Sequence, residues 1–121
     1  MATAATFNLH DDFSRRAVSL AADATWTPSP QAGVVRRMLD RVGGEIARAT
    51  SVVRYVPGSR FSRHVHGGGE EILVLEGAFE DDHGVYPTGS WLRSPHHSEH
   101  RPRTGAQGAV IYVKTGHLPG S

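Results

Sequence analysis

The stretch GSRFSRHVHGGGEEILVLEG, residues 58–77, decides the fold of this chain. Residues 60–66 alternate between side-chain types with a period of two, which predicts a β-strand. The triple glycine 67–69 predicts a sharp turn or a bulge. Residues 71–76 then form a short apolar run that ends at a glycine, which is typical of a buried strand. The stretch therefore predicts two strands that lie close together around a glycine turn.

The same stretch carries the residues with the clearest chemistry. His64 and His66 are two positions apart, so both imidazoles point to one face of a strand. Glu70 follows the glycine turn, which can return its carboxylate to the same point, and His100 is the candidate for a third imidazole from a distant strand. Glu71 competes with Glu70 and would lie on the opposite face of its strand. Imidazole and carboxylate together suit zinc, iron, nickel or manganese.

The rest of the chain repeats the β pattern. No window shows a helical stripe, and turn signals at 57–58, 81–84 and 87–89 recur at the spacing of a sandwich or a closed barrel. Further strands are predicted at 34–39, 45–56, 78–80, 90–93 and 109–114, with a possible short strand at 17–20. We expect one all-β domain with little or no helix.

Composition narrows the function classes. The chain has 121 residues and a net charge of +1, which argues against binding to nucleic acid or to a membrane surface. It has no cysteine, which excludes disulfides, thiolate zinc sites and iron–sulfur clusters. There is no long apolar run and no signal-like start, so we expect a cytoplasmic protein.

Two spacings carry a resemblance to a known family. Gly58, His64, His66, Glu70 and Gly77 match every fixed position of the first cupin motif. A second set, Gly89, Pro95 and His100, resembles the second cupin motif, although His97 stands where glycine is usual and Thr104 where asparagine is usual. The resemblance implies a cupin jelly-roll (RmlC-like) β-barrel that binds one divalent transition metal, most often zinc or iron. It also implies the metal ligands His64, His66, Glu70 and His100.

Residues 26–34, 66–77 and 81–89 look like the cupin domain of ChrR-type anti-sigma factors. That resemblance covers residues 24–115, which we assign to the barrel, with an arm or first strand at 1–23 and a tail at 116–121. In that family the cupin follows a helical, sigma-binding domain with a histidine–cysteine zinc site. Since this chain has neither that domain nor a cysteine, we do not expect it to bind a sigma factor. Related stand-alone cupins resemble iron dioxygenases that cleave aromatic ketones.

Three functions follow from the resemblance and the site. One is a metal-dependent dioxygenase acting on a small organic substrate, in which Glu70 leaves the metal and acts as a base. The second is a non-enzymatic zinc-binding sensor of a ligand or oxidant. The third is a module for association, and we expect a homodimer because edge strands of such barrels often pair.

Some further residues have two possible interpretations. His96 and His97 could support the site or be exposed loop residues. Arg54 and Arg93 could bind an anionic substrate if they point into the barrel, although a surface position is commoner for strand arginines. We interpret the Asp81–Gly84 segment as a hairpin turn with a solvated His83.

Overall fold

The computed structural model describes residues 8–43, 47–61, 64–65 and 67–118, with residues 47 and 64–65 described by their backbone. Nearly all of the regular structure is β, which confirms the predicted fold class, and a 3₁₀ turn, η1 (Ala21–Asp23), is the helical element of the described chain. The strands are β1 (Thr27–Pro28), β2 (Val34–Gly43), β3 (Ala47–Tyr55), β4 (His64–Val65), β5 (Glu70–Asp81), β6 (Gly84–Pro87), β7 (Trp91–Ser94), β8 (Glu99–His100) and β9 (Arg103–Thr115).

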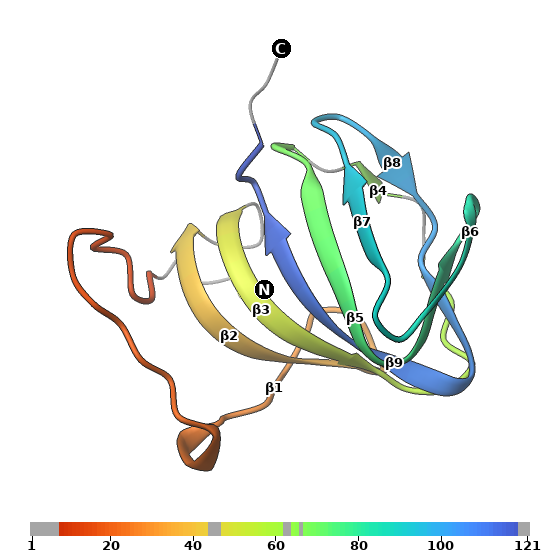
Figure 1. Cartoon of the computed structure of the whole chain (residues 1–121), viewed down its shortest axis with the longest axis horizontal. Helices are drawn as coiled ribbons and strands as arrows, with labels where there is room; N and C mark the ends of the chain where they lie inside the picture. The colour runs from red at the N-terminus through yellow and green to blue at the C-terminus, as the bar shows by residue number, and fades with distance from the viewer. Residues whose placement is uncertain (1–7, 44–46, 62–63, 66, 119–121) are drawn as a thin grey trace, which may run out of the picture.

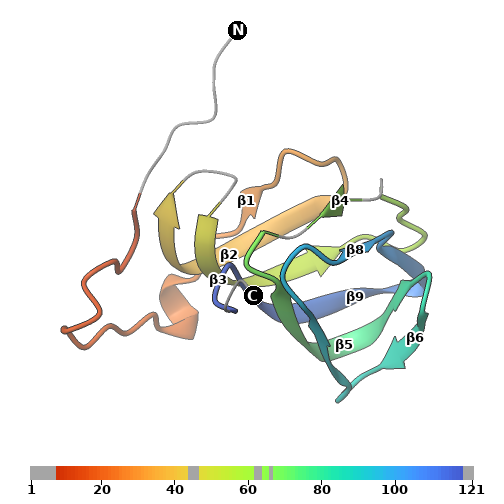
Figure 2. The ribbon, with the colours of Figure 1, turned by 90° about the horizontal axis from the view of Figure 1, so that it is seen from above.

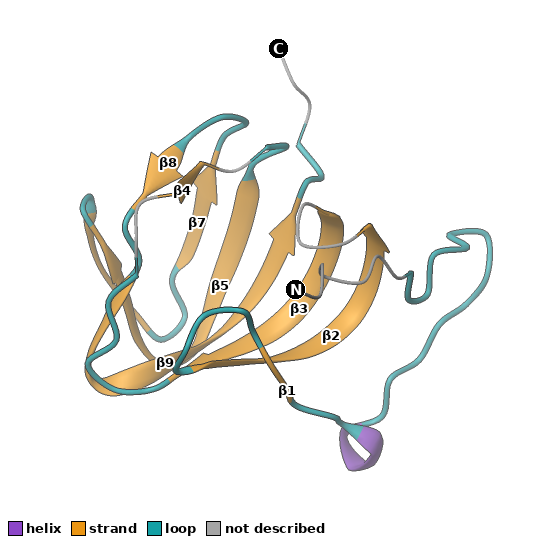
Figure 3. Cartoon of the chain, turned by 180° about the vertical axis from the view of Figure 1, so that it is seen from behind, coloured by secondary structure: helices purple, strands orange, loops and turns teal. Residues whose placement is uncertain are grey.

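The strands form one large antiparallel sheet and one short ribbon. The large sheet has the order β1-β2-β3-β9-β5-β6, and β7 also pairs with β5 (Figure 1). The ribbon consists of β4 and β8 and lies over the concave face of the curved large sheet (Figure 2). Seen from behind, residues 8–26 run outside the sheet before β1 (Figure 3). Within the described residues, no helix has the length and hydrophobicity needed to cross a membrane.

The core lies on the concave face of the large sheet. Alternate residues of β3, β5 and β9 point to that face, as the period of a strand requires. Phe79, Ile72, Ile111 and Val74 are the largest fully buried side chains. The partly buried Tyr55 and Phe61 pack against this cluster. The apolar core therefore fills the inside of the barrel below the ribbon.

The structure corrects several predicted boundaries. We expected a strand to end at Gly77 and another to begin at residue 78, but β5 runs through both without a break. Its register against β9 shifts between Val74 and Glu76 and again between Gly77 and Phe79, so two bulges bend one strand where the sequence predicts two. The possible strand at 17–20 is not formed. Of the predicted strand 60–66, residues 64–65 form β4, and residues 62–63 and 66 lie outside the described residues.

Candidate metal centre

Glu70 and Glu71 open β5 and lie on opposite faces of the sheet. Glu70 is 8% exposed and pairs in register with Thr115 of β9 and Ser94 of β7. Glu71 points outward, where its carboxylate accepts a hydrogen bond from Nε of Arg93 at 2.8 Å. The alternation of the strand therefore places one carboxylate inside the barrel and leaves the other in a surface ion pair.

The glycine turn before β5 is held on both sides. Gly68 donates its amide to Nδ1 of His96 at 2.7 Å, and its carbonyl accepts from the amide of Leu118 at 2.9 Å. Gly69 has φ +69°, and a Cβ there would meet the carbonyl oxygen of Ser94 at 2.7 Å. The turn thus needs glycine for its backbone angle and for space, and its contacts fix the point at which Glu70 enters the barrel.

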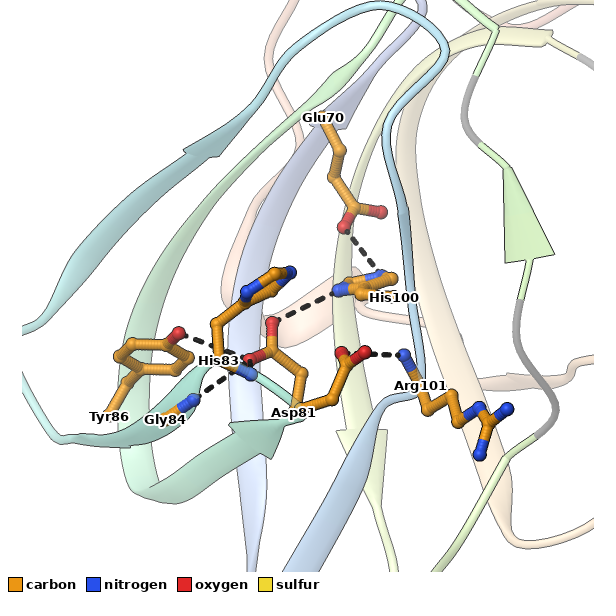
Figure 4. Close-up of polar contacts among 8 residues, drawn as sticks. Glu70, Asp81, His83, Gly84, Tyr86, His100 and Arg101 are labelled. Carbon is orange, nitrogen blue, oxygen red and sulfur yellow. Dashed lines mark hydrogen bonds and ion pairs between the residues drawn. The ribbon is translucent and has the colours of Figure 1, made fainter.

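His100 lies inside the barrel beside Glu70. Its side chain is 3% exposed, and Nε2 is 3.5 Å from Oε1 of Glu70 (Figure 4). Backbone pairing between β4 and β8 sets His64 directly opposite His100. The side chain of His64, and all of His66, lie outside the described residues. The described structure therefore joins two of the four predicted ligands and brings the backbone of a third next to them.

Burial changes the acidity of the groups at this point. Burial, assisted by the negative charge of Asp81, raises the pKa of Glu70 from 4.5 to about 8. Burial and the nearby Glu70 carboxylate also raise the pKa of Tyr55 well above its usual range. The proximity of Tyr55 to Glu70 was not predicted from the sequence.

Asp81, at the end of β5, is a site residue that the sequence interpretation missed. Its Oδ1 accepts hydrogen bonds from the backbone amides of His83 at 2.9 Å and Gly84 at 3.2 Å, so the predicted turn is present. Its Oδ2, however, is 3.2 Å from Nδ1 of His100 (Figure 4). An aspartate that begins a hairpin turn satisfies the local pattern completely, and nothing in the sequence signals its second partner on β8.

The described donors suit a divalent transition metal. A buried carboxylate and a buried imidazole that converge inside a barrel are the ligand types that zinc and non-haem iron take. Among the residues whose side chains the structure describes, no group of three or more histidine, cysteine, aspartate or glutamate side chains forms a complete metal site. The other two predicted ligands, His64 and His66, have no described side chains.

The other candidate side chains lie away from the buried Glu70–His100 pair. His83 is exposed, as predicted for a turn residue. Arg54 and Arg93 are exposed on the outer face, with the Arg54 guanidinium 4.4 Å from the ring centroid of Trp26. The two arginines therefore do not line the barrel, and the possibility that either binds an anionic substrate there is wrong. His97 has φ +65°, which explains why glycine is usual at its position in the motif.

A family model for the ChrR cupin-like domain matches residues 14–119 of the chain. The chain belongs to the ChrR cupin-like domain family. No curated protein matches the chain. The structure of Rhodobacter sphaeroides SigE in complex with the anti-sigma ChrR is similar at 25% identity and a TM-score of 0.64. The match covers 79% of this chain and 50% of that chain, so this ChrR cupin-like domain spans about half the length of the matched protein.

Two other solved structures share the fold at lower identity. An RmlC-like cupin protein from Ralstonia eutropha has a TM-score of 0.71 at 17% identity, covering 85% of this chain and 71% of that one. An acetylacetone dioxygenase from Acinetobacter johnsonii has a TM-score of 0.69 at 18% identity, covering 90% and 78%. These likenesses establish the cupin fold of the ChrR cupin-like domain.

Proposed function

We propose that this ChrR cupin-like domain binds one divalent transition metal through His64, His66, Glu70 and His100. The observation that carries the proposal is the buried pair formed by Glu70 and His100. The two side chains are 30 positions apart in the sequence, yet they meet inside the barrel at 3.5 Å. The register of β4 against β8, which sets His64 opposite His100, supports a shared site.

Burying a charged carboxylate costs free energy of folding unless a bound cation compensates its charge or a proton neutralises it. Buried titratable groups of this kind are often found at functional sites. Without a cation, Glu70 with a pKa of about 8 keeps its proton at neutral pH. Glu70 would release that proton on binding a cation, so metal affinity is expected to rise with pH up to about 8. Once a bound cation has displaced this proton, the carboxylate of Glu70 is free to act as a base toward a bound substrate.

The reaction we propose is a metal-dependent dioxygenation of a small organic substrate. A bound iron would supply Lewis acidity toward a chelating substrate and reactivity with dioxygen. Glu70 would act as the base, and the apolar core beside the site, including Phe79, would exclude water from it. The Phe79 ring centroid lies 6.2 Å from that of His100, so the apolar core adjoins the site on this side.

The metal site is tested by elemental analysis of protein purified without added metal. The wild type should carry close to one equivalent of zinc, iron, nickel or manganese, and His64→Ala and His100→Ala should lose it. His83→Ala is the matched control, because His83 is exposed in a turn, and it should keep the metal. A wild type that carries no metal and gains no thermal stability from any of the four would refute the site.

A second function is supported by the 25% identity to the ChrR complex. In it the domain is a non-enzymatic, zinc-binding sensor of a ligand or an oxidant, related to ChrR-type anti-sigma factors. Oxygen uptake with acetylacetone as the probe separates the two functions. Uptake by the iron-loaded protein that Glu70→Gln abolishes would support the oxygenase. Bound zinc together with no uptake by the iron-loaded form would support the sensor.

We also propose a small-molecule ligand and a homodimer for this protein, and we expect no binding to a sigma factor. Size-exclusion chromatography with light scattering tests the dimer, because the two masses differ twofold. A monomeric mass at all concentrations would refute it.

A further inference from the structure

Asp81 joins the β5–β6 hairpin to the candidate metal centre. The residue is 3% exposed and uses its two carboxylate oxygens for different partners. Oδ1 accepts hydrogen bonds from the amides of His83 and Gly84 and from the Tyr86 hydroxyl at 3.1 Å. Oδ2 lies 3.2 Å from Nδ1 of His100 (Figure 4). Three donors from one hairpin thus hold the carboxylate so that its other oxygen points at the histidine.

We propose that Asp81 is the positioning residue of the metal centre and fixes the tautomer of His100. The inference rests on the function proposed above. A carboxylate oxygen only accepts hydrogen bonds, so Nδ1 of His100 must carry the proton in this contact. The neutral ring then presents the lone pair of Nε2 toward Glu70, which is the form that binds a metal. Metal-ligating histidines are commonly oriented by a carboxylate on the other ring nitrogen.

The neighbouring carboxylate provides a matched control. Asp82 is exposed, and its Oδ1 accepts from the backbone amide of Arg101 at 3.4 Å. Asp81 and Asp82 are therefore adjacent acids in one hairpin, and they differ in that the Asp81 carboxylate is buried 3.2 Å from the His100 ring while that of Asp82 is exposed. A loss of charge in the hairpin affects both variants equally, whereas a loss of histidine orientation affects only one.

Substitution of Asp81 by asparagine should reverse the tautomer. The amide oxygen of the new side chain is needed by the three hairpin donors, so its NH₂ group faces Nδ1 of His100. A donor at that position favours the ring with the proton on Nε2, the atom that faces Glu70. The zinc affinity of Asp81→Asn should fall about 10- to 100-fold. That of Asp82→Asn should stay within about twofold of the wild type, since Asp82 is exposed and its Oδ1 accepts from a backbone amide, that of Arg101.

The experiment combines two readouts on the full chain. Long-range ¹H–¹⁵N NMR of metal-free protein reports the protonation of His100, with His100→Gln used to assign the signal. Competition with a zinc-binding dye reports affinity. We expect a protonated Nδ1 in the wild type and in Asp82→Asn, and an unprotonated Nδ1 in Asp81→Asn. An unprotonated Nδ1 in the wild type, or equal zinc affinity of the two asparagine variants, would overturn the inference.

The NMR readout separates this inference from the proposed function. If the wild type binds no zinc, the metal site fails, while the wild-type tautomer still shows whether Asp81 orients His100. If Asp81→Asn does not fold, Tyr86→Phe removes a single donor to Oδ1 and leaves the carboxylate in place. That variant should keep the proton on Nδ1, and a tautomer change in it would contradict the assignment of the role to Asp81.

Discussion

Two glycines of the first motif have the same backbone conformation but very different surroundings. Gly58 has φ +69° and Gly77 has φ +68°. A Cβ added at Gly58 meets nothing within 4 Å. A Cβ added at Gly77 falls inside contact distance of the Gly108 carbonyl oxygen, and lies 3.0 Å from its carbon and 3.3 Å from Cα of Ala109. Substitution by alanine therefore separates backbone strain from steric clash.

The magnitudes follow from these two terms. A left-handed alanine costs about 1–2 kcal/mol relative to glycine, partly offset by a loss of unfolded-state entropy of about 0.4–1 kcal/mol. Gly58→Ala should therefore cost about 1 kcal/mol. Gly77→Ala has the same strain, but the clash is with backbone, so β5 and β9 must separate where Gly77 pairs with Ala109. We expect a total cost of about 3–5 kcal/mol, in the range of strongly destabilising substitutions.

Urea unfolding and thermal unfolding in the presence of EDTA measure the stability of both variants without a contribution from bound metal. Since about 1 kcal/mol corresponds to roughly 4 °C in a domain of this size, the melting temperature should fall by roughly 4 °C for Gly58→Ala and by 12 °C or more for Gly77→Ala. Costs that agree within about 0.5 kcal/mol would refute the reasoning, because only the clash distinguishes the two positions.

Three other predictions concern the site, the core and the outer face. In metal-free folded protein, Glu70 keeps its proton up to pH about 8, whereas in the unfolded chain Glu70 loses its proton near pH 4.5. The free energy of unfolding should therefore be highest below pH 4.5 and fall by about 1.4 kcal/mol per pH unit between pH 4.5 and pH 8. Urea unfolding at pH 5 and pH 7.5 checks this, and an equal slope in Glu70→Gln would contradict it. Phe79, which is 1% exposed, should cost about 3–5 kcal/mol on substitution by alanine, and a cost below about 1 kcal/mol in urea unfolding would refute its place in the core. Arg54→Gln should alter the fluorescence of Trp26, whose ring lies 4.4 Å from the guanidinium, and change stability by less than about 1 kcal/mol; an unchanged spectrum would argue against the contact.

The pattern of apolar and polar residues along the chain predicted the strands well where a strand has one buried face. β3 and β9 are rich in β-branched residues, and the side-chain period of a strand points every second residue, such as Ile111 and Val113 of β9, to the same face. The same alternation separates Glu70 from Glu71, because adjacent residues of a strand must face opposite ways. These conclusions needed no knowledge of which strands pair.

Bulges and long-range partners could not be predicted in this way. The glycine at 77 signals a break in a strand, but whether the chain ends the strand or bends it depends on β9, which supplies the opposing register shift. Arg54 and Arg93 have no marker of direction in the sequence, and pairing with the neighbouring strands places them outside. Asp81 satisfies its turn locally, and only the approach of β8 gives its second oxygen a partner.

The sequence by itself determined the fold class and the spacing of the candidate ligands, because strand period and turn chemistry act over a few residues. Only the tertiary structure decided that Glu70 and His100 meet in a buried place, and that Asp81 stands behind the histidine. The reason is physical: the pKa of Glu70 and the orientation of His100 depend on burial and on groups from other strands, and those are set when the sheet closes.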